Sequence, residues 1–270
     1  MRAAYSRAWG DGDVVYSTNE AGGWDTTELY DGNGAAADAS NSVSIGIDSA
    51  GDVHIAYAVG GAAEHASNAT GDWVSEIVDG GWSTAYVSVV IDDADVVHMA
   101  YGWGGLSYAT NAGGLWSTER VSDGRSAWPS LGLDADGDVH IAFYASDDHS
   151  LEYATNAFGA WDVAVVDTDD DTGSYPAIAV DSSGASNIAY LLTTSGGGSA
   201  YDLRYASDWV GVWRTETIDS DAYSGEYASM AIDDEDVVHV AFHDISNGDL
   251  RYARRSTEDG RDNDCDGSEF

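Results

Sequence analysis

The sequence contains no lysine, so arginine alone supplies its positive side chains at neutral pH. Ten Lys plus Arg residues stand against 48 Asp plus Glu residues, which gives a formal net charge of −38 over 270 residues. A surface of this charge repels phosphate groups, because nucleic acids are bound by clustered cationic side chains that release counterions. The composition therefore excludes nucleic acids and anionic membrane surfaces as partners.

The sequence is also poor in cysteine, proline and long apolar runs. Its single cysteine, Cys265, excludes an internal disulfide framework. No apolar run approaches the roughly 20 residues that span a bilayer, and the opening residues MRAAYSRAWG lack the apolar segment of a signal peptide. We therefore expect no membrane insertion. Two prolines accompany 32 glycines and 11% aromatic residues, which is typical of many short strands joined by tight turns.

One phrase recurs along the chain. It reads DADGDVHIAF from Asp134, and related copies begin at Asp48, Asp92, Asp181 and Asp233. The sixth residue after the first aspartate is His54, His98, His140 or His239, and Asn187 in the weakest copy. The copies lie roughly 42 to 52 residues apart, which is the period of a propeller blade.

One complete unit spans Trp128–Asp167 and contains strand-like runs separated by short turn signals. A tryptophan opens the last run of each unit, at Trp24, Trp73, Trp116, Trp161 and Trp213. One large residue at a fixed place in each unit suits the wedge between two stacked sheets. We therefore expect the tryptophan column to belong to the core.

These repeats predict an all-β fold, a β-propeller of four-stranded antiparallel blades. We favour six blades, of which the first lacks its first strand and the last lacks its fourth; five blades, or a segment of a longer array, are the alternatives. The expected repeat units of the propeller, residues 1–258, are 1–32, 42–79, 86–122, 128–167, 175–219 and 227–258. Residues 259–270 form an acidic C-terminal tail.

The repeated phrases resemble those of a known group. The patterns D-x-x-G-x-x-H-I-A-Y, L-x-Y-A-T-N and G-x-W resemble the degenerate repeats of bacterial extracellular β-propellers related to the sialidase and Asp-box group. The resemblance covers about Ala3 to Ala253. It implies the propeller fold and an extracellular or cell-surface location. An Asp-box has one residue between Asp and Gly where these phrases have two, so sialidase activity is not carried over.

The tail carries a second resemblance. Its residues GRDNDCDG resemble the D-N-D-C-D-G phrase of bacterial cell-surface metal-binding repeats and of thrombospondin type 3 repeats. In those repeats alternate aspartates direct oxygen atoms at calcium, which prefers oxygen ligands. The resemblance implies calcium at Asp262, Asp264 and Asp266, and we expect no other cofactor. The acidic run Asp167–Ser174 is the densest candidate for weaker calcium binding.

The repeated histidines favour architecture over catalysis, because a catalytic site is normally single. We expect each imidazole to bond a turn carbonyl or the aspartate that opens its phrase. His149 and His243 break the repeat and are the histidines most available for chemistry. The interior arginines, which a sialidase would need as a cluster, occupy scattered repeat positions at Arg120, Arg125, Arg204 and Arg214.

A column of aromatic residues precedes the first strand of several units, at Tyr86, Trp128, Tyr175 and Tyr227. Aromatic faces beside Asp and Asn acceptors suit carbohydrate, since sugar C–H faces stack on rings and hydroxyls need acceptors. We therefore favour a non-catalytic ligand-binding or display module with a carbohydrate or surface glycan as ligand; a protein partner stays open. The alternatives are a polysaccharide-degrading enzyme, either a glycosidase or a lyase, and a purely structural segment of a larger surface protein.

Overall fold

A computed structural model describes residues 1–6, 13–20, 22–30, 39–81, 84–194, 200–209, 211–221 and 223–255. They fall into two compact units, Met1–Ala127 and the part from Trp128 onward. The expected calcium ligands Asp262, Asp264 and Asp266 lie outside the described residues.

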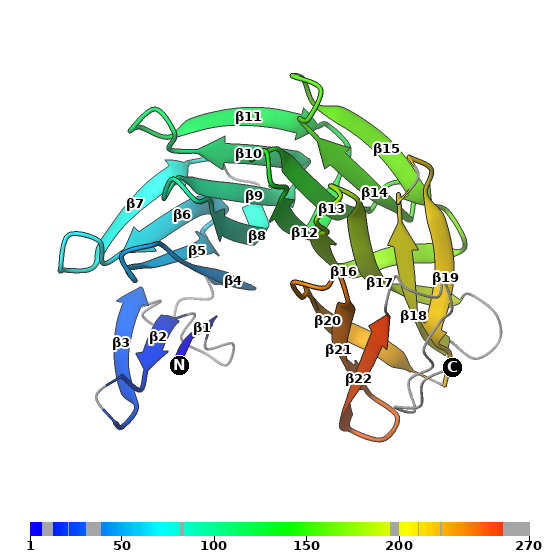
Figure 1. Ribbon diagram of the computed structural model, residues 1–270. Coiled ribbons are helices and arrows are strands. Elements are labelled where there is room, and N and C mark those ends of the chain that lie inside the picture. Colours follow the sequence, from blue (N-terminus) through cyan, green and yellow to red (C-terminus); the bar gives the residue numbers. More distant parts are fainter. Residues whose placement is uncertain are drawn as a thin grey trace. The chain divides into compact units, whose positions relative to one another are not determined.

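The first unit contains three antiparallel sheets (Figure 1). The first sheet has three strands in the order β1 (Arg2–Ser6), β2 (Val14–Thr18) and β3 (Asp25–Tyr30). The second has the order β4 (Ala39–Ile47), β5 (Val53–Val59), β6 (Ala62–Ser67) and β7 (Val74–Asp79). The third consists of β8 (Thr84–Ile91), β9 (Val97–Trp103), β10 (Leu106–Thr110) and β11 (Ser117–Ser122).

The second unit also contains three antiparallel sheets. Its first sheet has the order β12 (Ser126–Leu133), β13 (Val139–Ala145), β14 (Ser150–Thr155) and β15 (Asp162–Asp167). The next consists of β16 (Asp171–Val180), β17 (Ser186–Thr194), β18 (Ala200–Ser207) and β19 (Arg214–Asp219). The last has three strands, β20 (Ser224–Ile232), β21 (Val238–Asp244) and β22 (Asp249–Arg255).

The predicted fold class is confirmed. The described residues form six sheets of three or four antiparallel strands, and the two three-stranded sheets are the first and the last, as the repeat predicted. No helix occurs in the described ranges, so none there is long and apolar enough to cross a membrane.

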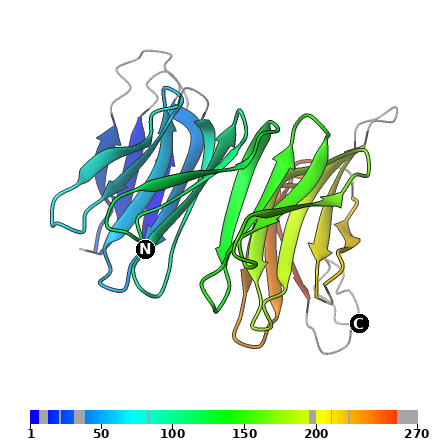
Figure 2. The ribbon, with the colours of Figure 1, turned by 90° about the horizontal axis from the view of Figure 1, so that it is seen from above.

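Within each unit, apolar side chains of neighbouring sheets pack together. Figure 2 shows the ribbon of these sheets from above. In the first unit Val14 and Tyr16 share a buried cluster with Ile55 and Tyr57 of the next sheet. In the second unit Tyr153 of β14 packs with Ile188 and Tyr190 of β17. A single twisted sheet cannot bury both faces by itself, so each sheet depends on its neighbours for its core.

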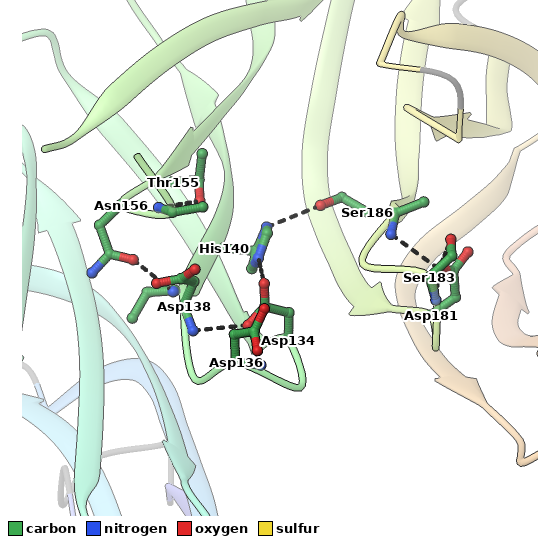
Figure 3. Close-up of polar contacts among 12 residues, drawn as sticks. Asp134, Asp136, Asp138, His140, Thr155, Asn156, Asp181, Ser183 and Ser186 are labelled. Atoms are coloured by element: carbon green, nitrogen blue, oxygen red, sulfur yellow. Dashed lines mark hydrogen bonds and ion pairs between the residues drawn. The ribbon is translucent and has the colours of Figure 1, made fainter. Parts of the chain in front are cut away.

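The repeated histidines close the hairpin between the first two strands that carry the repeated phrase, as predicted, and Asn187 takes this place in the sheet of β16 to β19. His140 Nε2 lies 3.4 Å from Asp134 Oδ2, and His140 Nδ1 lies 2.5 Å from the Tyr153 hydroxyl of β14. Figure 3 shows His140 between the Asp134 turn and Ser186 of the next sheet, whose hydroxyl lies 3.1 Å from Nδ1. His54, His98 and His140 are buried, and His239 is half-buried. The histidine therefore connects a turn, a neighbouring strand and, at His140, the next sheet.

The tryptophan column is only partly core. Trp73, Trp116, Trp161 and Trp213 are half-buried, whereas Trp24 is 58% exposed. Three of these tryptophans pack against a ring of the preceding sheet. The distances between ring centroids are 5.0 Å for Trp73 and Tyr16, 5.2 Å for Trp116 and His65, and 4.9 Å for Trp213 and Tyr153. Each of these three rings therefore covers the contact between two sheets and stays partly exposed.

Candidate functional site

Three of the four aromatic residues expected to bind ligand form one row in the second unit. The ring centroids of Trp128 and Tyr175 are 4.4 Å apart, and those of Tyr175 and Tyr227 are 4.8 Å apart. The residues come from β12, β16 and β20, the first strands of three successive sheets. We call Trp128, Tyr175 and Tyr227 the aromatic row.

All three members of the row have a left-handed backbone, with φ of 49° at Trp128, 51° at Tyr175 and 55° at Tyr227. Such a conformation costs a bulky residue about 1–3 kcal/mol and is found mainly where the surrounding structure imposes it, often at functional sites. The pairing of β16 with β17 shifts register between Ser174 and Ala177, and the pairing of β20 with β21 shifts between Glu226 and Ser229. The strands therefore bulge where the rings are presented.

Both prolines of the chain stand directly after members of the row, Pro129 after Trp128 and Pro176 after Tyr175. Proline has no N–H to give to a sheet ladder, so in sheets it occurs at edge strands and bulges. β12 and β16 are edge strands of their sheets. Pro176 falls within the register shift of β16 and is a sequence signal for it.

The row is one continuous surface rather than a set of separate pockets. Trp128 and Tyr175 are half-buried and cover one another, while Tyr227 at the end of the row is 66% exposed. Tyr227 therefore offers the accessible stacking face. The fourth expected ligand residue, Tyr86, belongs to the first unit, where its ring lies 5.9 Å from that of Trp103.

A polar cluster of Tyr144, His149 and Asp171 adjoins the other end of the row, because the Tyr144 and Trp128 ring centroids are 5.6 Å apart. The Tyr144 hydroxyl lies 2.6 Å from Asp171 Oδ1. His149 Nδ1 lies 2.9 Å from the Tyr144 hydroxyl oxygen and 3.3 Å from Asp171 Oδ1. We call these three residues the Tyr144 cluster.

The cluster fixes where protons sit. Burial, followed by the hydrogen bond to Asp171, raises the pKa of Tyr144. The phenol therefore stays protonated and donates a hydrogen bond to Asp171. Nδ1 of His149 can then meet both oxygen atoms favourably only as a donor. In neutral His149 the lone pair is consequently on Nε2, and the side chain is 61% exposed. The arrangement presents an oriented imidazole that can accept or deliver a proton.

The neighbouring acids of the run Asp167–Ser174 already have protein partners. Asp167 accepts the Tyr190 hydroxyl at 2.6 Å and lies 2.9 Å from Arg204 Nη1, which also contacts Asp169 at 2.9 Å. In the part of the chain that the structure describes, no group of three His, Cys, Asp or Glu side chains is arranged to hold a metal ion. Calcium at this run stays a prediction.

Sequence reasoning singled out His149 but missed Tyr144 and Asp171. Tyr144 occupies the position after the phrase's aromatic residue, where the other copies have Ala58, Gly102, Leu191 and His243. This difference from the other copies was the signal in the sequence that could have identified Tyr144 as a site residue. The role of Asp171 could not be inferred from a run of neighbouring aspartates, because only the fold selects which one reaches Tyr144.

Comparison with known proteins shows the fold and no family. No protein-family model matches the chain, and no curated protein matches it. A PL25 polysaccharide lyase, an ulvan lyase solved with a -[GlcA(1-4)Rha3S]- ligand, is similar in structure with a TM-score of 0.67 and 11% identity, over 94% of this chain and 76% of the lyase chain.

Two sialidases are also similar in structure. The NanB sialidase of Streptococcus pneumoniae has a TM-score of 0.58 at 11% identity, over 95% of this chain and 68% of its own. The Hadza microbial sialidase Hz136 has a TM-score of 0.57 at 11% identity, over 91% of this chain and 60% of its own. With the six sheets described above, these likenesses identify the fold as a β-propeller of the type found in sialidases.

Proposed function

We propose that this protein acts on carbohydrate at the aromatic row and that the Tyr144 cluster makes it a polysaccharide-degrading enzyme. The observation that carries the proposal is the contact between a strained row of rings and an oriented imidazole, through Trp128 and Tyr144 at 5.6 Å. In this proposal a sugar ring stacks on Tyr227, and the chain of the glycan extends along the row toward His149.

A polysaccharide-degrading enzyme fits the site better than a non-catalytic binding module does. Repeated sugar binding by a display module predicts equivalent aromatic pockets on several sheets, whereas Trp128, Tyr175 and Tyr227 join into one row. His149 with Asp171 supplies the acid–base group that bond cleavage requires, and such a group contributes about 10²–10⁴-fold to a rate. The activities named for the similar structures, an ulvan lyase and sialidases, support a carbohydrate substrate. A glycan substrate also fits the expected extracellular location.

The test separates binding from turnover. Reducing ends and unsaturated products are measured after incubation with a panel of polysaccharides, and affinity is measured by titration with the corresponding oligosaccharides. Tyr227→Ala should weaken binding about tenfold or more, because it removes the exposed stacking face. His149→Ala should leave binding in place and lower turnover by about 10²-fold or more.

Asp234→Asn is the matched control. Asp234 is exposed in the turn between β20 and β21, at the opposite end of the sheet from the start of β20. It should change neither binding nor turnover. Binding without turnover in the unaltered protein would instead establish the non-catalytic module, and binding that survives Tyr227→Ala would remove the row from the site.

A further inference from the structure

The charges around the aromatic row identify a class of substrate. In each antiparallel sheet of the second unit the first strand begins beside the end of the second strand, as Asp171 pairs with Thr193 and Ser224 pairs with Asp244. The row residues lie near these strand starts. The described loop residues 145–150, 167–171, 219–221 and 244–249 therefore lie at the end of the sheets where the row is presented.

These loops are rich in carboxylates. The exposed acids of the described loop residues are Asp147, Asp148, Asp169, Asp170, Asp221 and Asp249. Asp171 itself keeps 42% of its side-chain surface exposed while its Oδ1 atom takes the contacts with Tyr144 and His149. The rim of the row is therefore strongly negative.

Three arginines of the same sheets, Arg204, Arg251 and Arg255, form ion pairs with carboxylates. Arg204 is buried and contacts Asp167 and Asp169, each at 2.9 Å. Arg251 forms an ion pair with buried Asp219, and Arg255 lies 3.2 Å from Glu216. Lysine is absent from the sequence. A uronate or sulfated sugar at the row would face acids without cationic compensation from these arginines, and desolvating its charge there would be costly.

Aromatic faces and carboxylates together favour a cation. The face of an aromatic ring carries negative electrostatic potential and attracts an ammonium group, and the net charge of −38 concentrates cations at the surface. A glycan that carries ammonium groups on its sugar rings meets both conditions, since the ring stacks while the ammonium contacts a carboxylate.

We infer that the row takes a polymer of protonated, non-acylated hexosamine, and that Asp171 binds the ammonium group of a sugar stacked along the row. This inference rests on the proposed function. It also favours hydrolysis over β-elimination, because elimination requires a sugar carboxylate to acidify the C5–H bond and a hexosamine has none. In hydrolysis water adds across the glycosidic bond, and the leaving oxygen receives a proton that His149 is placed to deliver.

The experiment compares three matched oligosaccharides with the full chain: a glucosamine hexamer, an N-acetylglucosamine hexamer and a galacturonate hexamer. Titrations are run near pH 6 at about 20 mM and about 300 mM salt, where screening differs strongly. We expect the glucosamine hexamer to bind at least about tenfold more tightly than the acetylated one at low salt, with a smaller ratio at high salt. Galacturonate should bind most weakly.

Variants distinguish a site from general attraction to an acidic surface. Asp171→Asn should weaken binding of the glucosamine hexamer about tenfold and leave the acetylated hexamer unchanged, while Asp234→Asn, which removes the same charge elsewhere, should have little effect on either. Tyr227→Ala should weaken both sugars. A short oligolysine, which has charge but no sugar face, should lose less affinity than either sugar on Tyr227→Ala.

Each outcome decides between the two proposals. Equal affinity for the two hexosamine ligands, or preference for galacturonate, overturns the inference and leaves the carbohydrate site standing. Equal effects of Asp171→Asn and Asp234→Asn show that the attraction is diffuse and also overturn it. Failure of every oligosaccharide to bind overturns the proposed function itself.

Discussion

The asparagine in the weakest repeat shows which nitrogen of the repeated histidines carries the proton. Asn187 Nδ2 donates toward Asp181 Oδ2 at 3.5 Å, and Asn187 Oδ1 accepts the Tyr205 hydroxyl. His98 makes the same pair of contacts, with Asp92 at 3.4 Å through Nε2 and with the Tyr108 hydroxyl at 2.6 Å through Nδ1. Because the amide has a fixed donor and a fixed acceptor, the equivalence assigns Nε2–H and an unprotonated Nδ1 to neutral His98.

His65 is the exception to this arrangement, since it stands where Tyr108, Tyr153, Tyr205 and Tyr252 stand in other sheets. His54 Nδ1 lies 3.0 Å from His65 Nε2, and His65 Nδ1 lies 3.3 Å from Glu76 Oε1. Burial lowers the pKa of His65, the His54 imidazole lowers it further, and Glu76 acts in the opposite direction. Trp116 packs edge-on against the ring at 5.2 Å.

The lowered pKa of His65 makes stability sensitive to mild acid. Unfolding restores the pKa to its usual value near 6.5, so below that pH the unfolded chain binds more protons than the folded one. Stability is fully present above about pH 6.5 and falls, by at most about 1.4 kcal/mol per pH unit, as pH drops toward the folded pKa. His65→Tyr should reduce the loss of stability between pH 7.5 and 5.5, as measured by urea unfolding.

A second substitution at the same position provides the check on this titration. His65→Phe should reduce the loss of stability in the same way, because it also removes the imidazole that is protonated on unfolding. If His65→Tyr and the unaltered protein lose equal stability over the same pH interval, His65 does not control the acid sensitivity.

At the scale of elements, hydrogen bonds between equivalent turns link neighbouring sheets. Ser49 donates its backbone N–H and its hydroxyl to Asp95 of the next sheet, each at 2.7 Å. Ser182 makes the same two contacts with Asp236, at 2.8 and 2.5 Å. Asp95 and Asp236 have φ of 61° and 58° where other turns use glycine. The two bonds offset the cost of a left-handed aspartate.

The tryptophan that precedes the fourth strand makes a second contact between sheets, and its removal should lower stability. Trp213 packs against Tyr153 of the preceding sheet at 4.9 Å and against a buried apolar cluster. Trp213→Ala should lower the free energy of unfolding by about 2–4 kcal/mol, somewhat less than for a fully buried ring. Denaturant unfolding measures the loss.

Trp209 gives a matched comparison in the same unit. It lies in the turn before β19 and is 71% exposed. Trp209→Ala should change the free energy of unfolding by no more than about 0.5 kcal/mol. If Trp213→Ala and Trp209→Ala lower the free energy of unfolding equally, the packing of Trp213 against Tyr153 does not stabilise the fold.

Repetition explains why the strands could be predicted and the site could not. Each strand position is represented in several copies, so a chance residue such as Asn187 in place of histidine does not hide the pattern. The aromatic column was visible for the same reason. Its joining into one row depends on the left-handed backbone at Trp128, Tyr175 and Tyr227, which a bulky residue rarely adopts. Tyr144 and His149 depart from the residues of the other copies, so the repeat gave no indication of the Tyr144 cluster.

At the scale of the whole molecule, the net charge sets the conditions under which the fold is stable. The charge of −38 is spread over a chain without lysine, and several of the described arginines are committed to local ion pairs such as Arg204 with Asp167. Carboxylates in the folded state are closer together than in the unfolded chain, so their repulsion opposes folding. The uncompensated charge must be screened by ions from the medium.

Thermal stability should therefore rise with monovalent salt, by about 5 °C or more between about 20 mM and about 0.5 M, because screening shortens the range of the repulsion. Scanning calorimetry in sodium chloride and in choline chloride measures this, and the two salts should act alike if screening is responsible. Melting temperatures that stay flat in both salts would show that the acids repel no more strongly in the folded chain than in the unfolded one.

Calcium at millimolar concentration, added at the high salt level, should raise the melting temperature further by mass action at specific sites. The triple change Asp262→Asn, Asp264→Asn and Asp266→Asn tests whether the tail is one of these sites. If this variant loses the calcium-dependent rise in melting temperature and keeps the salt-dependent rise, the calcium site is in the tail.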